Sequence, residues 1–232
     1  MKTNMMQLSK FLDWSVTGDG YVGYATHNKN AHYAIQRDPK HEDYISVIAD
    51  KFIGLQDCEL VISEYVRNDN NKRVLSLKTG SHPLFTRIRE RLYANNRRVI
   101  DPHQLTTLDW EAAAFLYMDD GSLCVNNKGS LIARLSTCAY TYGEQELLRK
   151  AFIEKLGVVW NINRTGRNLW QLNLAKASRD LWFDNIRPYI VPSYGYKLPE
   201  FLQKETSRTD DDLVYIAGTD NRQSRFNQSR EY

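Results

Sequence analysis

Apolar and polar residues in the first half of the chain alternate between helical spacing and the period of two that is typical of strands. Apolar positions from Phe11 to Val16 predict a helix with Ser9 as its N-cap, and Gly18-Asp19-Gly20 follows its end. Beyond that point the pattern predicts strands at 21–26 and 31–37, a helix at 41–55, strands at 59–66 and 73–78, and a helix at 82–93. The first half therefore has the order α-β-β-α-β-β-α.

The second half repeats this order. The pattern predicts a helix at 108–118, strands at 122–125 and 131–138, a helix at 144–156, strands at 158–163 and 169–174, and a helix at 178–189. Leu75-Ser76-Leu77 matches Leu172-Asn173-Leu174, and Ile88-Arg89 matches Ile186-Arg187, at offsets of 97 and 98 positions. Agreement in both order and offset favours a duplication.

We therefore predict a mixed α/β (α+β) fold made of two pseudo-symmetric αββαββα repeats, at residues 1–104 and 105–204. Residues 205–232 are polar and are predicted to be a loosely ordered tail.

Composition limits the function classes. The 232 residues are 42% hydrophobic, which is enough for a buried core, and a net charge of +3 permits a polyanionic partner without requiring one. Three cysteines without a CxxC pair exclude a disulfide framework and a zinc knuckle. The sequence has neither an apolar run of the roughly 20 residues that cross a bilayer nor a signal peptide. We expect an intracellular protein away from membranes, and the choice between phage or bacterial cytoplasm and an organelle stays open.

Two acidic, glycine-rich segments carry the chemistry. Val16-Thr17-Gly18-Asp19-Gly20 and Tyr117-Met118-Asp119-Asp120-Gly121 place their last aspartates 101 positions apart, each after an apolar stretch of helical length. If the repeats pair about a pseudo-two-fold axis, Asp19 and Asp120 meet at the helix ends. Carboxylates that repel one another there favour bound cations, and Mg²⁺ prefers such oxygen ligands. Taken singly, either segment also reads as an ordinary turn.

These segments resemble the two motif copies of single-chain LAGLIDADG homing endonucleases, and the resemblance covers residues 8 to 202. It implies a saddle of antiparallel sheets around two central motif helices. It also implies that Asp19 and Asp120 bind two or three Mg²⁺ ions, with Mn²⁺ as a substitute, and that Gly18 and Asp119 belong to the metal site. For Asp119 a helix-terminal or solvated role is the alternative. The sequence departs from the family where the helices cross, because Asp13, Trp14 and Phe115 replace small residues there.

The resemblance also implies a basic residue beside each scissile phosphate. The matching positions are Arg98, in the segment before Pro102, and Lys197, before Pro199. A cation there stabilises negative charge on phosphate, although arginine does not accept a proton. The alternative is a solvated basic residue next to a proline turn.

In the family, alternate side chains of each sheet enter the DNA major groove. Arg suits guanine, and Asn or Gln suits adenine, by paired hydrogen bonds. The candidates are His32, Gln36, Lys72, Ser76, Lys78, Arg134, Ser136, Asn161, Asn163, Arg164, Arg167, Asn168, Gln171 and Asn173. Lys29, Lys72 and Lys128 lie in predicted turns and suit phosphates.

The sequence thus predicts a monomeric, Mg²⁺-dependent homing endonuclease that makes a double-strand break in a long, asymmetric DNA target. Two alternatives stay open. One is an intron-splicing maturase that binds intron RNA on the same scaffold, and the other is an inactive DNA-binding descendant. Cleavage and binding assays on DNA and intron RNA separate the three.

Overall fold

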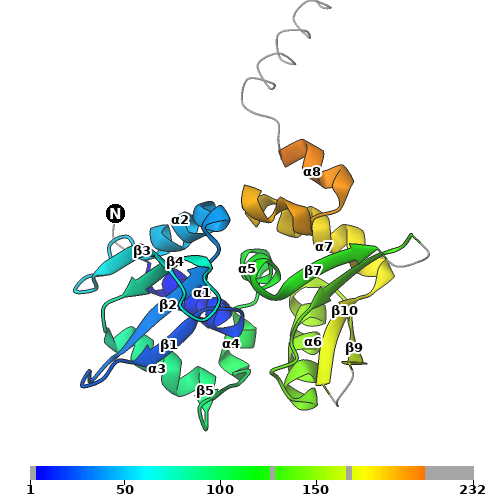
Figure 1. The fold of residues 1–232 in the computed structure, drawn as a ribbon. Coiled ribbons are helices and arrows are strands. Elements are labelled where there is room, and N and C mark those ends of the chain that lie inside the picture. The colour runs from blue at the N-terminus through cyan, green and yellow to red at the C-terminus, as the bar shows by residue number, and fades with distance from the viewer. Residues whose placement is uncertain (1–3, 126–128, 166–168, 207–232) are drawn as a thin grey trace, which may run out of the picture.

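The computed structural model describes residues 4–125, 129–165 and 169–206. Two four-stranded antiparallel sheets dominate it, with strand orders β1-β2-β4-β3 and β7-β8-β10-β9. In Figure 1 the sheets lie on either side of two central helices, α1 (Met5–Thr17) and α5 (Trp110–Asp120). The mixed α/β architecture predicted from the hydrophobic pattern is confirmed.

The first repeat runs from α1 to α3. After α1 come β1 (Tyr21–Tyr24), β2 (Ala31–Arg37), the 3₁₀ turn η1 (Pro39–His41), α2 (Glu42–Lys51), β3 (Leu60–Val66), β4 (Arg73–Thr79) and α3 (Pro83–Leu92). A small hairpin, β5 (Tyr93–Ala94) and β6 (Arg97–Arg98), and α4 (Pro102–Thr106) then connect the repeats. The sequence pattern did not predict this hairpin or α4, because both are too short for a periodic signal.

The second repeat begins with α5 and has the same order. It contains β7 (Gly121–Val125), β8 (Leu131–Leu135), α6 (Tyr142–Leu156), β9 (Trp160–Thr165), β10 (Leu169–Leu174), the 3₁₀ turn η3 (Lys176–Ser178) and α7 (Arg179–Ile186). The turns η4 (Arg187–Tyr189) and η5 (Pro192–Lys197) and the helix α8 (Glu200–Thr206) follow. Because α8 continues to Thr206, it crosses the predicted limit at 204, and the limits of the two repeats stay a prediction.

Several predicted boundaries are corrected. The N-cap of α1 is Asn4 rather than Ser9, because the Asn4 side chain accepts hydrogen bonds from the backbone of Met6 and Gln7 and the helix begins earlier. The helix predicted at 41–55 ends at Lys51, ahead of Gly54, whose φ is 85°. The helix predicted at 178–189 divides at Pro188, which lacks the backbone donor that an α-helix needs.

The helices α1 and α5 pack against each other at the molecular centre. The Phe11 and Phe115 rings meet edge to face, with centroids 5.2 Å apart. Ala113 and Ala114 are fully buried. The Asp13 carboxylate forms an ion pair with Arg91 on α3. The fully buried Trp14 donates to the Thr107 hydroxyl at 3.2 Å. Asp13 and Trp14 therefore have partners outside the crossing, whereas Phe115 packs within it against Phe11.

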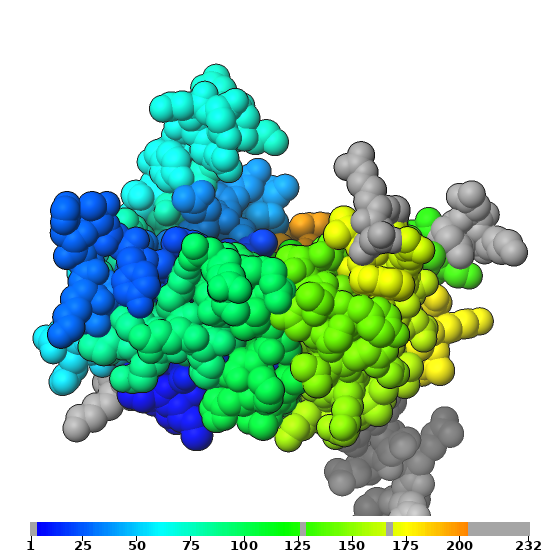
Figure 2. Space-filling view, turned by 90° about the horizontal axis from the view of Figure 1, so that it is seen from below, coloured from blue at the N-terminus to red at the C-terminus, as the bar shows by residue number. Residues whose placement is uncertain are grey.

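Each sheet buries one face and leaves the other open. In β2 the buried residues Ala31, Tyr33 and Ile35 alternate with more exposed ones, so one face packs on the helices. The strand β3 is exposed from Val61 to Val66, and Figure 2 shows the β3–β4 hairpin, in cyan, standing clear of the body. The two open faces are the surfaces on which the predicted polar residues must be placed.

Two further findings concern membrane-spanning helices and the cysteines. No helix in the part of the chain that the structure describes is long and apolar enough to cross a membrane. Cys58, Cys124 and Cys138 are free thiols.

The Phe11–Phe115 contact predicts a stability change. Phe115→Ala removes a side chain that is only 3% exposed, and we expect the free energy of unfolding to fall by about 3–5 kcal/mol. Phe201→Ala is the control, since Phe201 is 64% exposed and its loss should change the free energy by less than about 0.5 kcal/mol. Urea unfolding followed by circular dichroism measures both, and equal midpoints for the two variants would contradict the central packing.

Candidate functional site

The two acidic segments identified in the sequence lie in contact at the ends of α1 and α5. The Asp19 backbone N–H donates to Oδ2 of Asp119 at 3.1 Å. Gly18 lies so close to the same carboxylate that a side chain at position 18 would collide with it. Thus the C-terminal ends of the motif helices converge, as the pseudo-two-fold pairing predicts.

Asp119 is not a solvated residue, and it is not placed as a metal ligand. Its side chain is fully buried, and Oδ1 accepts hydrogen bonds from Arg37 Nη2 and, at 2.6 Å, from the Tyr44 hydroxyl. Because Oδ2 receives the Asp19 N–H, both oxygens already have protein donors. These contacts, with partners on β2 and α2, favour the helix-terminal alternative for Asp119, and its metal role stays a prediction.

Asp19 is more accessible than Asp119. The Asp19 side chain is 49% exposed, whereas that of Asp119 is fully buried, and Asp120 as a residue is half-buried. Burial within the site raises the pKa of Asp120 to about 7, and the negative charges of Asp19 and Asp119 act in the same direction. Burial and the charge of Asp119 also raise the pKa of Asp19, against the opposing effect of Arg37. The carboxylates thus repel in the absence of a cation.

Lys197 is buried at the end of α5 rather than solvated. Its ammonium donates to the Met118 carbonyl at 2.5 Å and lies 3.5 Å from the Asp119 carbonyl, while its own carbonyl accepts the Tyr117 hydroxyl at 2.9 Å. Burial lowers the pKa of Lys197 to about 8, although the nearby aspartates oppose this. The ammonium therefore neutralises the negative end of the α5 dipole.

Arg98 occupies the matching position on α1. Its guanidinium donates to the carbonyl of Gly18, the residue that caps α1. The Gly18 carbonyl oxygen, which the resemblance places at the metal site, thus already accepts one hydrogen bond. Each repeat therefore supplies one cation to its own motif helix. The predicted place of Arg98 and Lys197 beside the scissile phosphates stays a prediction.

The sequence analysis did not identify Arg37 and Tyr44. Arg37 is the last residue of β2, and Nη1 forms an ion pair with Asp19 Oδ2 at 3.2 Å. The only sequence signal is its position: Ala31, Tyr33, Ile35 and Arg37 share the inward phase of the strand, where a charge requires a buried partner.

The open face of the first sheet carries most of the predicted residues of that repeat. The register pairs Gln36 with Ser76 and Ala34 with Lys78, so these residues share a face with His32. Tyr21, Ser63 and Tyr65 lie on the same face and were not predicted. Lys72 and Lys29 are exposed outside the strands.

The open face of the second sheet collects the remaining described candidates, with one correction. Asn173 pairs with both Arg134 and Asn161, and Gln171 pairs with Asn163. Ser136 is exposed directly after β8. Arg164 pairs with Trp170 on the opposite face, because side chains alternate along β9, so the structure does not bring it together with the other candidates. Arg167, Asn168 and Lys128 lie outside the described residues.

The donor chemistry of the site fits a hard divalent cation. Carboxylate oxygens are the ligands that Mg²⁺ prefers, and it retains several waters. Within the described ranges no group of three or more His, Cys, Asp or Glu side chains is arranged to hold a metal ion. Two carboxylates are therefore an incomplete set that water and a phosphate oxygen would complete.

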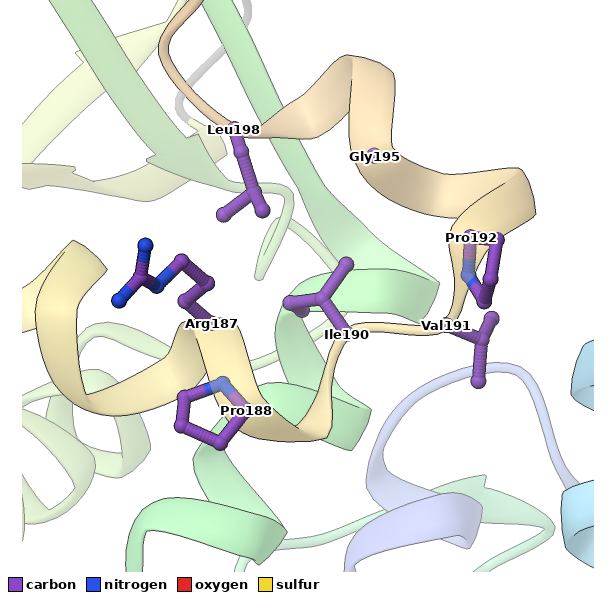
Figure 3. Close-up of a pocket in the computed structure, with 7 residues that line it drawn as sticks. All are labelled: Arg187, Pro188, Ile190, Val191, Pro192, Gly195 and Leu198. Carbon is purple, nitrogen blue, oxygen red and sulfur yellow. The ribbon is translucent and has the colours of Figure 1, made fainter. Parts of the chain in front are cut away.

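A cavity among the described residues lies elsewhere. It has a volume of about 480 Å³ and lies between η4 and η5, where Figure 3 shows Arg187, Ile190 and Leu198 in its lining. None of its lining residues is an aspartate of the converging helix ends, so we do not place the site there.

The chain is similar in sequence to a known family and to curated proteins. A model described as the LAGLIDADG DNA endonuclease family matches residues 13–181. A probable intron-encoded endonuclease 1 of Wickerhamomyces canadensis is 24% identical over 189 residues, which cover 79% of this chain and 80% of the relative. The cytochrome b mRNA maturase bI2 of Debaryomyces hansenii is 23% identical over 193 residues, covering 81% of this chain and 72% of the relative.

The fold also resembles a solved structure. That structure is the homing endonuclease I-WcaI bound to its DNA recognition sequence, with a TM-score of 0.70 and 22% sequence identity. The match covers 86% of this chain and 88% of the other. It extends over both repeats and both sheets.

The raised pKa of Asp120 predicts a pH-dependent stability change. A carboxyl group whose pKa is about 7 in the fold and 3.8 unfolded destabilises the folded protein above pH 7, and this penalty disappears as the pH falls toward 4. We therefore expect Asp120→Asn to raise the free energy of unfolding by up to about 4 kcal/mol at pH 8 and by less than about 1 kcal/mol at pH 4. Thermal unfolding measures this, with the exposed Asp184→Asn as control. A gain that is the same at both pH values would contradict the assignment.

Proposed function

The chain belongs to the LAGLIDADG DNA endonuclease family, and on that premise we propose that it is a monomeric, site-specific homing endonuclease that makes a double-strand break in a long, asymmetric DNA target. One observation carries this proposal. Two helices end together with accessible carboxylates, between two sheets whose open faces are rich in hydrogen-bonding side chains.

Asp19 and Asp120 are the proposed metal ligands. A bound Mg²⁺, for which Mn²⁺ substitutes, would activate the attacking water and stabilise the leaving oxygen of the phosphodiester. Arg98 and Lys197 hold the carbonyl ends of the two motif helices, and their charges lower the pKa of both aspartates. In this proposal the two cations therefore support the chemistry electrostatically, and they partly offset the rise in pKa that burial causes at both carboxylates.

The two sheets would read different half-sites. The first presents His32, Gln36, Ser76 and Lys78 on its open face, whereas the second presents an arginine and several amides, at Arg134, Asn161, Asn163, Gln171 and Asn173. Arginine favours guanine and amides favour adenine in the major groove. Because the two sets differ, the proposed target is asymmetric. The free thiols fit a reducing, intracellular compartment.

A maturase on the same scaffold is the second candidate. It is favoured by the similarity to a protein named as a cytochrome b mRNA maturase. This activity would require basic surface for RNA but not the paired carboxylates. A chain that promotes intron splicing equally well after Asp19→Asn and Asp120→Asn would have the second function.

Cleavage is the direct test. With Mg²⁺ we expect the purified chain to cut DNA from the region that flanks its own gene, rejoined without the gene, and to leave scrambled DNA intact. Asp19→Asn and Asp120→Asn should each lower the cutting rate by about 10²-fold or more, because each removes a charge that the metal requires. Linearisation of a supercoiled plasmid gives the rate.

The controls separate chemistry from binding. Asp184→Asn, which alters an exposed aspartate on α7, should cut at the wild-type rate. A mobility shift with chelated metal should show DNA binding by both site variants. Binding without cutting by the wild type would instead support an inactive descendant, and undiminished cutting by Asp120→Asn would overturn the metal assignment.

The two faces of β8, β9 and β10 offer a matched test of the DNA surface. Arg134 lies on the open face and Arg164 on the opposite one. We expect Arg134→Gln to weaken binding to the cognate target by about 1–3 kcal/mol, as the loss of a base contact does. Arg164→Gln should change binding by less than about 0.5 kcal/mol. Fluorescence anisotropy at one fixed salt concentration measures both, and a larger loss for Arg164→Gln would contradict the proposed surface.

A further inference from the structure

The two proposed metal-binding aspartates are held differently. Asp19 has an ion-pair partner, because Arg37 Nη1 lies 3.2 Å from its Oδ2. For Asp120, within the residues that the structure describes, no side-chain hydrogen bond or ion pair connects its carboxylate to a donor. The two aspartates thus differ in their contacts, although the two motif helices that carry them are related by the sequence repeat.

Arg37 itself is locked in place. Its other terminal nitrogen, Nη2, pairs with the buried Asp119, and its guanidinium lies 5.2 Å from the centre of the Tyr44 ring. The Tyr44 hydroxyl donates to the same Asp119 oxygen at 2.6 Å. With a side chain only 9% exposed, Arg37 has a geometry set by three contacts, of which the one with Asp119 crosses between the repeats.

The second repeat lacks this device. Ala34 pairs with Tyr21, just after the first motif, and Arg134 pairs with Ser122, just after the second. Three residues further along lie Arg37 and Thr137, so a neutral hydroxyl replaces the guanidinium. Thr137 is buried and donates to Gln145 at 3.0 Å, away from the carboxylates.

Asp119, the buried partner of Arg37, also occurs in one repeat only. Asp119 corresponds to Gly18 in the first motif, since both precede the proposed metal-binding aspartate. The absence of a side chain at Gly18 provides the space that the Asp119 carboxylate occupies. Asp119 and Arg37 therefore form a single cross-repeat unit with no counterpart.

We propose that Arg37, locked by Asp119 and Tyr44, is a positioning residue that orients the Asp19 carboxylate, and that its absence from the second repeat makes the two strand-cutting centres unequal. The inference rests on the proposed endonuclease function. On this proposal the two cutting centres require different Mg²⁺ concentrations. The centre whose carboxylate is already oriented fills at a lower Mg²⁺ concentration, so one strand is cut ahead of the other.

Arginine is needed for geometric rather than only electrostatic reasons. Its planar fork presents two nitrogens at once, one to each carboxylate, whereas a lysine ammonium is a single point charge on a flexible stem. Groups that hold a metal-binding carboxylate typically change metal affinity or activity by 10-fold to 100-fold when altered. Replacing arginine by lysine keeps the positive charge near the metal and removes only the fork.

Arg37→Lys is therefore the test. The two DNA strands of the target are labelled separately, and the cutting rate of each is measured against Mg²⁺ concentration. For the wild type we expect one strand to be cut at lower Mg²⁺. In Arg37→Lys the Mg²⁺ needed for half-maximal cutting of that strand should rise by about tenfold or more, with the other strand within about twofold.

Arg91→Lys is the matched control. Arg91 also bridges two carboxylates, Asp13 on α1 and Asp101, but it lies away from the paired aspartates. Its substitution should leave the ratio of the two strand rates unchanged. Thermal unfolding of both variants reports any common loss of stability.

The outcomes distinguish this inference from the proposed function. If the wild type cuts neither strand, the endonuclease function fails. If it cuts both but Arg37→Lys slows them by the same factor, the positioning role is overturned while the function stands. Should Arg37→Lys not fold, Tyr44→Phe removes only the hydroxyl bond to Asp119, and it must shift the strand ratio in the same direction for the inference to hold.

Discussion

The convergence of two helix C-termini, each followed or ended by aspartate, is the constraint on which the rest of this structure depends. Carbonyl ends and carboxylates add negative charge at the point where α1 and α5 come together, and such charges repel in a partly buried site. The protein neutralises this charge in separate ways. Lys197 and Arg98 take the helix carbonyls, whereas Arg37 and Tyr44 take Asp119.

The negative charge that the protein does not neutralise is the one that a bound metal ion would balance. Asp120 has a carboxyl pKa raised to about 7, which reflects a charge that the fold itself does not balance. A bound divalent cation would remove the free-energy cost of ionising Asp120. The same carboxylate therefore destabilises the fold without metal and serves the proposed activity. The same reasoning separates Asp119 from its neighbours, because its charge is already balanced by protein donors.

The duplicated fold is used asymmetrically. Both repeats supply a motif helix, a four-stranded sheet and one cation at the helix end. Only the first supplies Arg37, and only the second supplies a carboxylate before the proposed metal-binding aspartate. A small residue at Gly18 and a charged one at Asp119 are complementary, since the first leaves the space that the second fills. Difference between the repeats therefore extends from the sheet faces to the centre of the molecule.

The sequence by itself determined the repeat order, the two motif segments and the pairing of Arg98 with Lys197, because helical and strand periodicity and motif spacing are local properties. It also predicted most of the open-face residues through alternation. Arg164 was included because the predicted strand ended at residue 163, whereas β9 continues to Thr165 and places Arg164 on the opposite face. Short elements such as α4 and the β5–β6 hairpin escaped it for lack of a period. Only the tertiary structure decided the roles of Arg37, Tyr44 and Asp119. Their contacts join positions 75 to 82 residues apart, and no local pattern shows which distant carboxylate a buried guanidinium will meet.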